Sequence, residues 1–218
     1  MGELIIRAAL VAIVAYFCGC FNGAVIVSKY ILHNDVRNHG SGNAGLTNFM
    51  RVFGGKLAAV VIATDALKAV VALVVGLLAV NGYAPSFWND ELQPIAMLWA
   101  AMFCLLGHMF PCMFHFRGGK GVLSGGIIAI MLDWRVALVV WGGFIVLVLL
   151  TKWVSLGSCW AGLTFPISIW FVFHDPLCTV FGIVCGGLLL VQHRSNIKRL
   201  LNGTESKFSL HRKKETDQ

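Results

Sequence analysis

The sequence predicts an all-α polytopic membrane protein, a bundle of about seven transmembrane helices with glycine-rich cytoplasmic loops. Two features of the composition support this fold class. Of the 218 residues, 58% are hydrophobic and only 12% are charged, whereas soluble domains have about 45–50% apolar and about 25% charged residues. The mean hydropathy of +0.79 and the 24 glycines agree with helices packed closely in lipid. We expect a single domain over residues 1–218.

Seven apolar segments are the third observation. Crossing a hydrocarbon core of about 30 Å takes about 20 helical residues. The first segment is longer than the apolar region of a signal peptide and lacks a clear cleavage site, so we interpret it as a membrane helix. The fourth has a short apolar stretch, and it could instead form a re-entrant hairpin with its neighbour, which would leave five crossings. The segments are 4–30, 57–80, 92–110, 121–133, 135–151, 153–173 and 176–192.

The cations predict which way the protein faces. The polar segments 33–56, 108–121 and 193–218 fall on the same side for either seven or five crossings. Of the 17 Lys and Arg residues, all but Arg7, Lys68 and Arg135 belong to this side. By the positive-inside rule this face is cytoplasmic, and so is the C-terminus. The tail cations Arg212, Lys213 and Lys214 are interpreted as contacts to anionic membrane lipid.

The cysteines predict packing in place of disulfides or metal binding. All seven lie in or at the edge of apolar segments, as is typical of reduced cysteines. Cys104, His108 and Cys112 could share one helix face as metal ligands. However, Pro111 interrupts that face and no fourth ligand is obvious, so we expect no metal.

The first polar loop, HGSGNAGLTNFMRVFGGK at residues 39–56, is suited to binding phosphate. Its glycines let several backbone N–H groups converge, its neutral side chains add donors, and Arg51 adds a planar cation. An ordinary turn would also account for so many glycines. The candidate ligands are Gly40, Ser41, Gly42, Asn43, Gly45, Thr47 and Asn48.

The second and third loops have similar chemistry. In the second, the run from Arg117 to Gly121 resembles half of a nucleotide P-loop, but the hydroxyl residue that binds Mg²⁺ is missing, so nucleotide hydrolysis is not expected. His108 is either a proton shuttle or a helix-end histidine. The third loop, HRSNIKRLLNGTES at residues 193–206, could be an interfacial helix. That interpretation does not explain His193, Asn196 and Glu205.

Together the three loops resemble the signature segments of the bacterial membrane acyl-phosphate:glycerol-3-phosphate acyltransferases, the PlsY family. GSGNAGLTN followed by Arg51, GHMFPCMFHFRGGKGV and HRSNIKRLLNGTE occur in the family's order and at its separations. Asp65 and Lys68 in the second apolar segment resemble the family's D-x-x-K. Leu46 replaces a residue that is usually small, and His115 adds an imidazole. These two departures bear on loop packing more than on chemistry.

The resemblance implies transfer of a fatty acyl group from acyl phosphate to the sn-1 hydroxyl of glycerol 3-phosphate. The products would be lysophosphatidic acid and inorganic phosphate, in the first acylation step of phospholipid biosynthesis. It also implies a multi-pass protein of the bacterial inner membrane, in contact with membrane lipid, whose active site faces the cytoplasm. We expect no cofactor, no metal and no nucleic-acid partner. The sequence does not indicate the oligomeric state.

The resemblance also suggests roles for individual residues. Arg51 and Lys120 would clamp phosphates, and Arg194 and Asn196 would hold glycerol phosphate while Glu205 orients a cation. His108 and His193 would carry protons, unless the oxygens of the acyl phosphate do so. The catalytic candidates are Ser41, Arg51, His108, Lys120, His193 and Asn196. The substrate-binding candidates are Gly40, Gly42, Asn43, Gly45, Thr47, Asn48, Gly118, Gly119, Gly121, Arg194, Arg199 and Glu205.

The sequence has neither a G-x-S-x-G elbow nor a histidine followed five positions later by an aspartate. Neither a serine acyl-enzyme nor the His-x4-Asp machinery of soluble-type acyltransferases is therefore indicated. Direct attack on an activated acyl phosphate would suffice. A phosphate transporter would need an internal repeat and polar sites at the membrane midplane, and a lipid-binding scaffold would not need clusters of Gly, Asn and His. We expect Asp65 and Lys68 to pair and to face the bundle, as a structural pair or as the floor of the active site.

Overall fold

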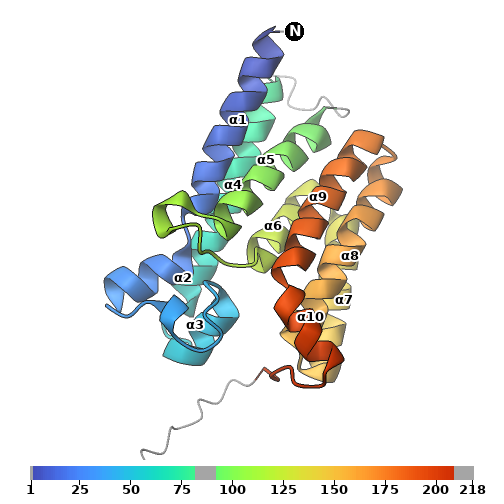
Figure 1. Cartoon of the computed structure of the whole chain (residues 1–218). Helices are drawn as coiled ribbons and strands as arrows, with labels where there is room; N and C mark the ends of the chain where they lie inside the picture. Colours follow the sequence, from blue (N-terminus) through green and yellow to red (C-terminus); the bar gives the residue numbers. More distant parts are fainter. Residues whose placement is uncertain (1, 82–91, 209–218) are drawn as a thin grey trace, which may run out of the picture.

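The computed structural model describes residues 2–81 and 92–208, and every regular element in this part of the chain is a helix (Figure 1). The tail cluster of Arg212, Lys213 and Lys214 lies outside the described residues. The longer helices are α1 (Gly2–Cys20), α4 (Ala58–Asn81), α5 (Gln93–Met109), α6 (Val122–Leu132), α7 (Trp134–Thr151), α8 (Val154–Phe173) and α9 (Pro176–Gln192). The short ones are α2 (Gly23–Ile26), η1 (Val27–Ile31), η2 (Val36–Asn38), α3 (Leu46–Phe53), η3 (Cys112–Phe114) and α10 (Arg194–Leu201).

The all-α membrane fold is confirmed, and each predicted apolar segment contains a helix. Five segments are long and apolar enough to cross a membrane, and α9 with α10 forms a sixth candidate that is bent by 61°. The helix α6 has 11 residues. At about 1.5 Å per residue it is about 16 Å long, which is about half of the hydrocarbon thickness. By length and composition, five or six of the predicted segments are complete spans, and α6 is the fourth segment, whose crossing the sequence left open.

The helices α1 and α5 approach each other backbone to backbone. A Cβ atom on Gly19 would overlap the carbonyl of Cys104, and one on Gly107 would overlap the carbonyl of Tyr16. The two glycines therefore permit a contact that no larger residue would allow, as small residues do between helices in lipid. This contact fixes the end of α5, where His108 lies.

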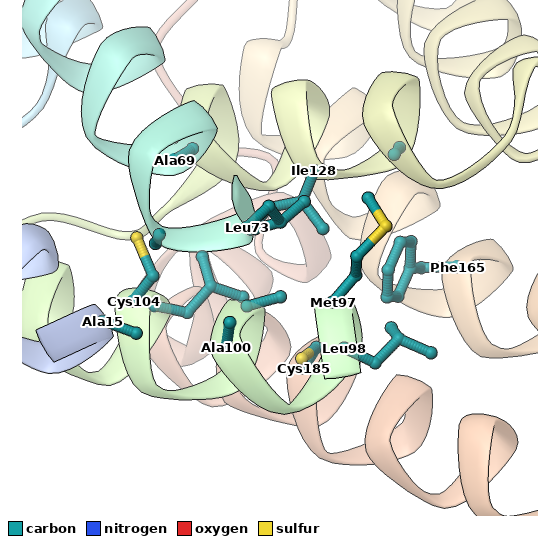
Figure 2. Close-up of a cluster of buried hydrophobic side chains, with 14 of the residues drawn as sticks. Ala15, Ala69, Leu73, Met97, Leu98, Ala100, Cys104, Ile128, Phe165 and Cys185 are labelled. Atoms are coloured by element: carbon teal, nitrogen blue, oxygen red, sulfur yellow. The ribbon is translucent and has the colours of Figure 1, made fainter. Parts of the chain in front are cut away.

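A buried apolar cluster joins these two helices to the rest of the bundle (Figure 2). It includes Ala15 of α1, Leu73 of α4, Ile128 of α6 and Phe165 of α8. Large apolar side chains also cover the outside, among them Leu149 and Leu150 of α7, as expected for helices that face lipid. The first and third polar loops lie at one end of this bundle (Figure 1).

Candidate active site

A cavity of about 580 Å³ lies where the three predicted loops meet. The helix α3 lies within the first loop and α10 lies within the third. Both helices are at the same end of the bundle (Figure 1). Segments that are some 150 residues apart in sequence thus share one site. The predicted residues that line this cavity are Gly40, Ser41, Asn43, Gly45, Thr47, Asn48, Arg51, His108, Lys120, Gly121, His193, Asn196, Arg199 and Glu205.

Asn48 gives the first loop its shape. Its side chain is 2% exposed, and its Nδ2 contacts the carbonyl oxygens of Val36, His39 and Asn43 at 3.1–3.2 Å. Its Oδ1 accepts a hydrogen bond from the backbone N–H of Ser41 at 2.9 Å. We predicted that Asn48 binds substrate, but its amide is occupied by the loop backbone. Asn48 therefore holds the loop in place beside the cavity.

Two side chains that the sequence analysis missed fix this loop to its neighbours. Asn22 is fully buried at the break between α1 and α2, and its Nδ2 donates to the carbonyl of Ala44 at 3.0 Å. Arg37 donates to the carbonyl of Phe114 at 2.8 Å and is paired with Asp35. That guanidinium lowers the pKa of the Asp35 carboxyl. A single Asn-Gly inside a long apolar run was the signal that could have identified Asn22.

Four predicted substrate ligands do not line the cavity. The N–H groups of Gly118 and Gly119 donate to the carbonyls of Met109 and His108 at 3.1 Å, so they complete the end of α5 and are not offered to phosphate. The N–H of Gly42 closes a turn to His39 at 3.0 Å. Arg194 is exposed and donates to the carbonyl of Val191 at 3.2 Å. Among these, Gly118 and Gly119 matter for close packing, because a Cβ on either would overlap the carbonyl or the ring of His108.

A buried polar cluster lies at the inner end of the cavity. Lys68 Nζ is 2.7 Å from Asp65 Oδ1, 2.6 Å from His108 Nδ1 and 3.0 Å from the carbonyl oxygen of Phe21. All three side chains are at most 5% exposed. The predicted pairing of Asp65 with Lys68 is confirmed, and Asp65 and His108 also line the cavity. The link from this pair to His108 was not predicted.

A second hydrogen-bonded chain also borders the cavity. Glu205 accepts from Arg199 Nε at 2.7 Å, from Asn196 Nδ2 at 2.9 Å and from Ser155 at 3.1 Å. The Asn196 Oδ1 in turn accepts from Lys120. Burial alone would raise the pKa of Glu205, but its hydrogen bonds from Arg199, Asn196 and Ser155 outweigh it and lower the pKa overall. Burial also lowers the pKa of Lys120 to about 8.

The segment after α10 forms a strap across the cavity. Two residues of this segment, Ser206 and Phe208, line the cavity. Arg51 donates to the hydroxyl of Ser206 at 3.3 Å, and the backbone N–H of Phe208 donates to the carbonyl of Lys152 at 2.8 Å. The strap (residues 202–208) thus connects α3 with the turn between α7 and α8.

The remaining wall of the cavity is apolar and was not predicted. Most of its side chains come from the second half of the chain, and its apolar residues are Leu46, Val122, Leu123, Trp141, Phe144, Val154 and Phe208. One cavity therefore combines cationic and amide donors with an apolar surface. Such a site suits a ligand that has both an anionic group and a hydrocarbon chain.

The alternative metal site does not form. Cys104 Sγ lies 3.9 Å from the carbonyl of Lys68, whereas Cys112 Sγ lies 3.9 Å from Cys20 Sγ. The two thiols therefore point to different partners. Across residues 2–81 and 92–208, no three metal-ligating side chains come together.

Comparison with known proteins decides the family. The family model described as glycerol-3-phosphate acyltransferase matches residues 9–203. The chain belongs to the glycerol-3-phosphate acyltransferase family. It is 39% identical to a glycerol-3-phosphate acyltransferase of Thermoanaerobacter sp. (strain X514) over 201 residues, which are 92% of this chain and 96% of the relative. It is 35% identical to the Bacillus subtilis (strain 168) member over 199 residues, or 91% and 96% of the two chains.

A solved structure supports the same family assignment. The crystal structure of PlsY, an integral membrane glycerol 3-phosphate acyltransferase in its glycerol 3-phosphate form, is similar with a TM-score of 0.80 and 30% sequence identity. The similarity covers 93% of this chain and 96% of the PlsY chain. The lysophosphatidic acid form of PlsY gives a TM-score of 0.77. The fold and the acyltransferase family predicted from the three loops are thus confirmed.

Proposed function

We propose that this protein transfers a fatty acyl group from acyl phosphate to the sn-1 hydroxyl of glycerol 3-phosphate. The products are lysophosphatidic acid and inorganic phosphate. The observation that carries the proposal is a single cavity lined both by donors (Arg51, Lys120, Asn196) and by apolar side chains that include Trp141 and Phe144. One substrate is a soluble dianion and the other joins a phosphate to a lipid tail, and this cavity offers both surfaces. The glycerol 3-phosphate and lysophosphatidic acid forms of PlsY support the same pair of ligands here.

The transfer proceeds by direct attack. The glycerol hydroxyl adds to the acyl carbonyl carbon, the C–O bond to phosphate breaks, and the hydroxyl proton leaves to an oxygen of the departing phosphate or to a nearby base. In the described part of the chain, the Ser41 hydroxyl has no histidine or carboxylate hydrogen-bonded to it, so it lacks the activation that a nucleophile needs. Ser41 and the cations act by positioning and by electrostatic stabilisation.

We place this reaction at the cytoplasmic face of a bacterial inner membrane. The cations of the three loops gather at the cavity end of the bundle, and the positive-inside rule assigns that end, with the C-terminus, to the cytoplasm. Both substrates are then drawn from the cytoplasm or from the adjoining leaflet. The whole chain, residues 1–218, is assigned to one acyltransferase domain.

The test is a phosphate-release assay with purified protein, acyl phosphate and glycerol 3-phosphate in the absence of Mg²⁺. We expect release that depends on both substrates and a product acylated at the sn-1 position. An acyl thioester supplied in place of acyl phosphate should give no product. Transfer from the thioester alone would refute the donor assignment. A stable acyl mass on the Ser41 peptide, discharged by glycerol 3-phosphate, would refute direct attack.

A further inference from the structure

His108 has no role yet beyond its position at the cavity. Its side chain comes from the last turn of α5 and is 3% exposed. One ring nitrogen, Nδ1, faces Lys68 at 2.6 Å. The other, Nε2, has no hydrogen-bond partner within residues 2–81 and 92–208. His108 lines the cavity, and its Nε2 is not among the fully buried polar atoms that lack a partner in the described residues. Nε2 therefore opens toward the cavity and is accessible to a ligand.

The surroundings of Lys68 decide which ring nitrogen of His108 carries the hydrogen. An ammonium group has three donors and no acceptor. Its partners are a backbone carbonyl, the Asp65 carboxylate and His108 Nδ1, and the first two can only accept. The third N–H of Lys68 is therefore directed at Nδ1, which must act as the acceptor. In a neutral imidazole with an accepting Nδ1, the hydrogen is on Nε2.

Charge supports the neutral ring. The ammonium of Lys68 and the carboxylate of Asp65 neutralise each other at 2.7 Å. A protonated His108 would add a second cation to this buried pair, with its Nδ1 3.8 Å from the same Asp65 oxygen and 2.6 Å from the ammonium. Two cations at that distance repel each other strongly where water is excluded. The neutral Nε2–H form is the one that fits.

The Nε2–H group lies where two loops meet. A Cβ atom on Gly119 would overlap both His108 Nε2 and the carbonyl of Ala44. The second loop thus leaves space beside Nε2 only because position 119 is glycine, and the first loop borders the same space. A ligand held between the two phosphate-binding loops comes within reach of this donor.

His193 provides a contrast within the same cavity. Its Nδ1 is 2.8 Å from the carbonyl of Leu189, which can only accept, so the hydrogen of this ring is on Nδ1. The Nε2 of His193 is then an acceptor. Two histidines that look equivalent in the sequence are thus held in opposite tautomers.

We propose that His108 is a fixed hydrogen-bond donor to an anionic oxygen of a substrate, and that Lys68 is the positioning residue that sets its tautomer. This inference rests on the proposed function for the identity of the substrates. It excludes His108 as the group that removes the hydroxyl proton, because Nε2 already carries a hydrogen. The acceptor is either a phosphate oxygen or the carbonyl oxygen that gains charge as the glycerol hydroxyl attacks.

Two substitutions separate the donor role from its alternatives. His108→Gln places an N–H near the position of Nε2, whereas His108→Asn keeps an acceptor near Lys68 but has no group that reaches the Nε2 position. We expect the Gln variant to keep activity within about tenfold of wild type, and the Asn variant to lose about 10- to 150-fold, as for one hydrogen bond to a charged group. Equal and severe losses would indicate a general base, and equal mild losses would indicate packing. Either result would overturn the proposal.

The kinetics of His108→Asn identify the oxygen that accepts. A higher KM for one substrate with kcat unchanged assigns the acceptor to the phosphate of that substrate. A lower kcat with both KM values unchanged assigns it to the carbonyl oxygen in the transition state. No change in any of these parameters would overturn the donor role.

Nitrogen NMR of histidine-labelled wild-type protein tests the tautomers without any turnover. At a pH where both rings are neutral, His108 should show Nε2–H and His193 should show Nδ1–H, with His108→Gln used to assign the signals. An Nδ1–H form of His108 would overturn the inference even if the acyl transfer proceeds as proposed. Conversely, an inactive wild type with the expected tautomers would refute the proposed function alone.

The role of Lys68 is tested by a double variant, Asp65→Leu with Lys68→Met. The pair is removed together because either single change would leave a buried charge without its partner. The His108 signal should then shift toward a mixture of tautomers, and the transfer rate should fall. A signal that remains purely Nε2–H would refute the positioning role of Lys68. Should this variant not fold, the wild-type spectrum still decides the tautomer.

Discussion

Replacement of Asn48 tests whether the first loop is held by one side chain. Asn48→Ala removes its contacts to the carbonyls of Val36, His39 and Asn43 and to the N–H of Ser41. An amide nitrogen has only two hydrogens, so its three contacts count as two hydrogen bonds, and the bond from Ser41 is the third. At about 0.5–1.5 kcal/mol for each of the three, the cost is about 1.5–4.5 kcal/mol. A chain of this size loses about 2–4 °C in Tm per kcal/mol, so we expect Tm to fall by roughly 3–18 °C. Because the loop lies beside the cavity, acyl transfer should also be lost.

Asn48→Asp makes the same test more specific. A carboxylate can still accept from Ser41, but it presents an oxygen where the amide nitrogen contacts three carbonyl oxygens. The Asp variant should therefore be at least as unstable as the Ala variant. Both would be followed by thermal unfolding in detergent and by phosphate release. Asn34→Ala is the control, since the side chain of Asn34 is exposed and hydrogen-bonds to the exposed side chain of His39. A Tm within about 1 °C of wild type, together with full activity, would show that Asn48 does not organise the loop.

Three further predictions concern the cavity. Burial lowers the pKa of Lys120 to about 8, so its positive charge is lost as the pH rises through 8. The KM for the phosphate substrate that Lys120 contacts should therefore rise between pH 7 and 9. Lys120→Arg, which stays charged, should flatten this rise. Gly119→Ala should abolish transfer, because the new methyl group overlaps His108 and Ala44, whereas Gly55→Ala, which has open space around it, should be tolerated in the same assay. Arg51→Lys keeps the charge but loses the planar fork of the guanidinium group, so kcat/KM should fall at least tenfold. The control is Arg135→Lys, because Arg135 forms an exposed ion pair with Asp133, and kcat/KM should then change less than twofold. Equal effects of the two substitutions would refute the role of Arg51 as a phosphate clamp.

The sequence was sufficient to predict the helices and the convergence of three loops. Apolar runs of membrane length are visible without any partner. The number of complete spans is not, because α6 has apolar composition but covers only about half of the membrane thickness. Composition does not report whether a short apolar helix spans a membrane or ends inside the bundle.

The direction of individual side chains could not be predicted. An asparagine in a glycine-rich loop has the same sequence signature whether its amide faces a ligand or the loop backbone, as that of Asn48 does. The spacing of Asp65 and Lys68 indicated their pairing, but His108 is 40 positions beyond Lys68 and no local pattern joins them. The apolar wall with Trp141 and Phe144 was missed for a different reason. In a membrane helix the lipid-facing and cavity-facing sides are equally apolar, so periodicity does not distinguish them.

The strap at residues 202–208 has a consequence for the order in which the protein is made. Glu205 accepts hydrogen bonds from Ser155, Asn196 and Arg199, and Asn196 in turn contacts Lys120. Synthesis runs from the N-terminus, so every helix from α1 to α10 has left the ribosome before Glu205 emerges. The hydrogen bonds of Glu205 can therefore form only after every helix that they join has been synthesised. The strap side of the cavity is the side that closes after the helices are made.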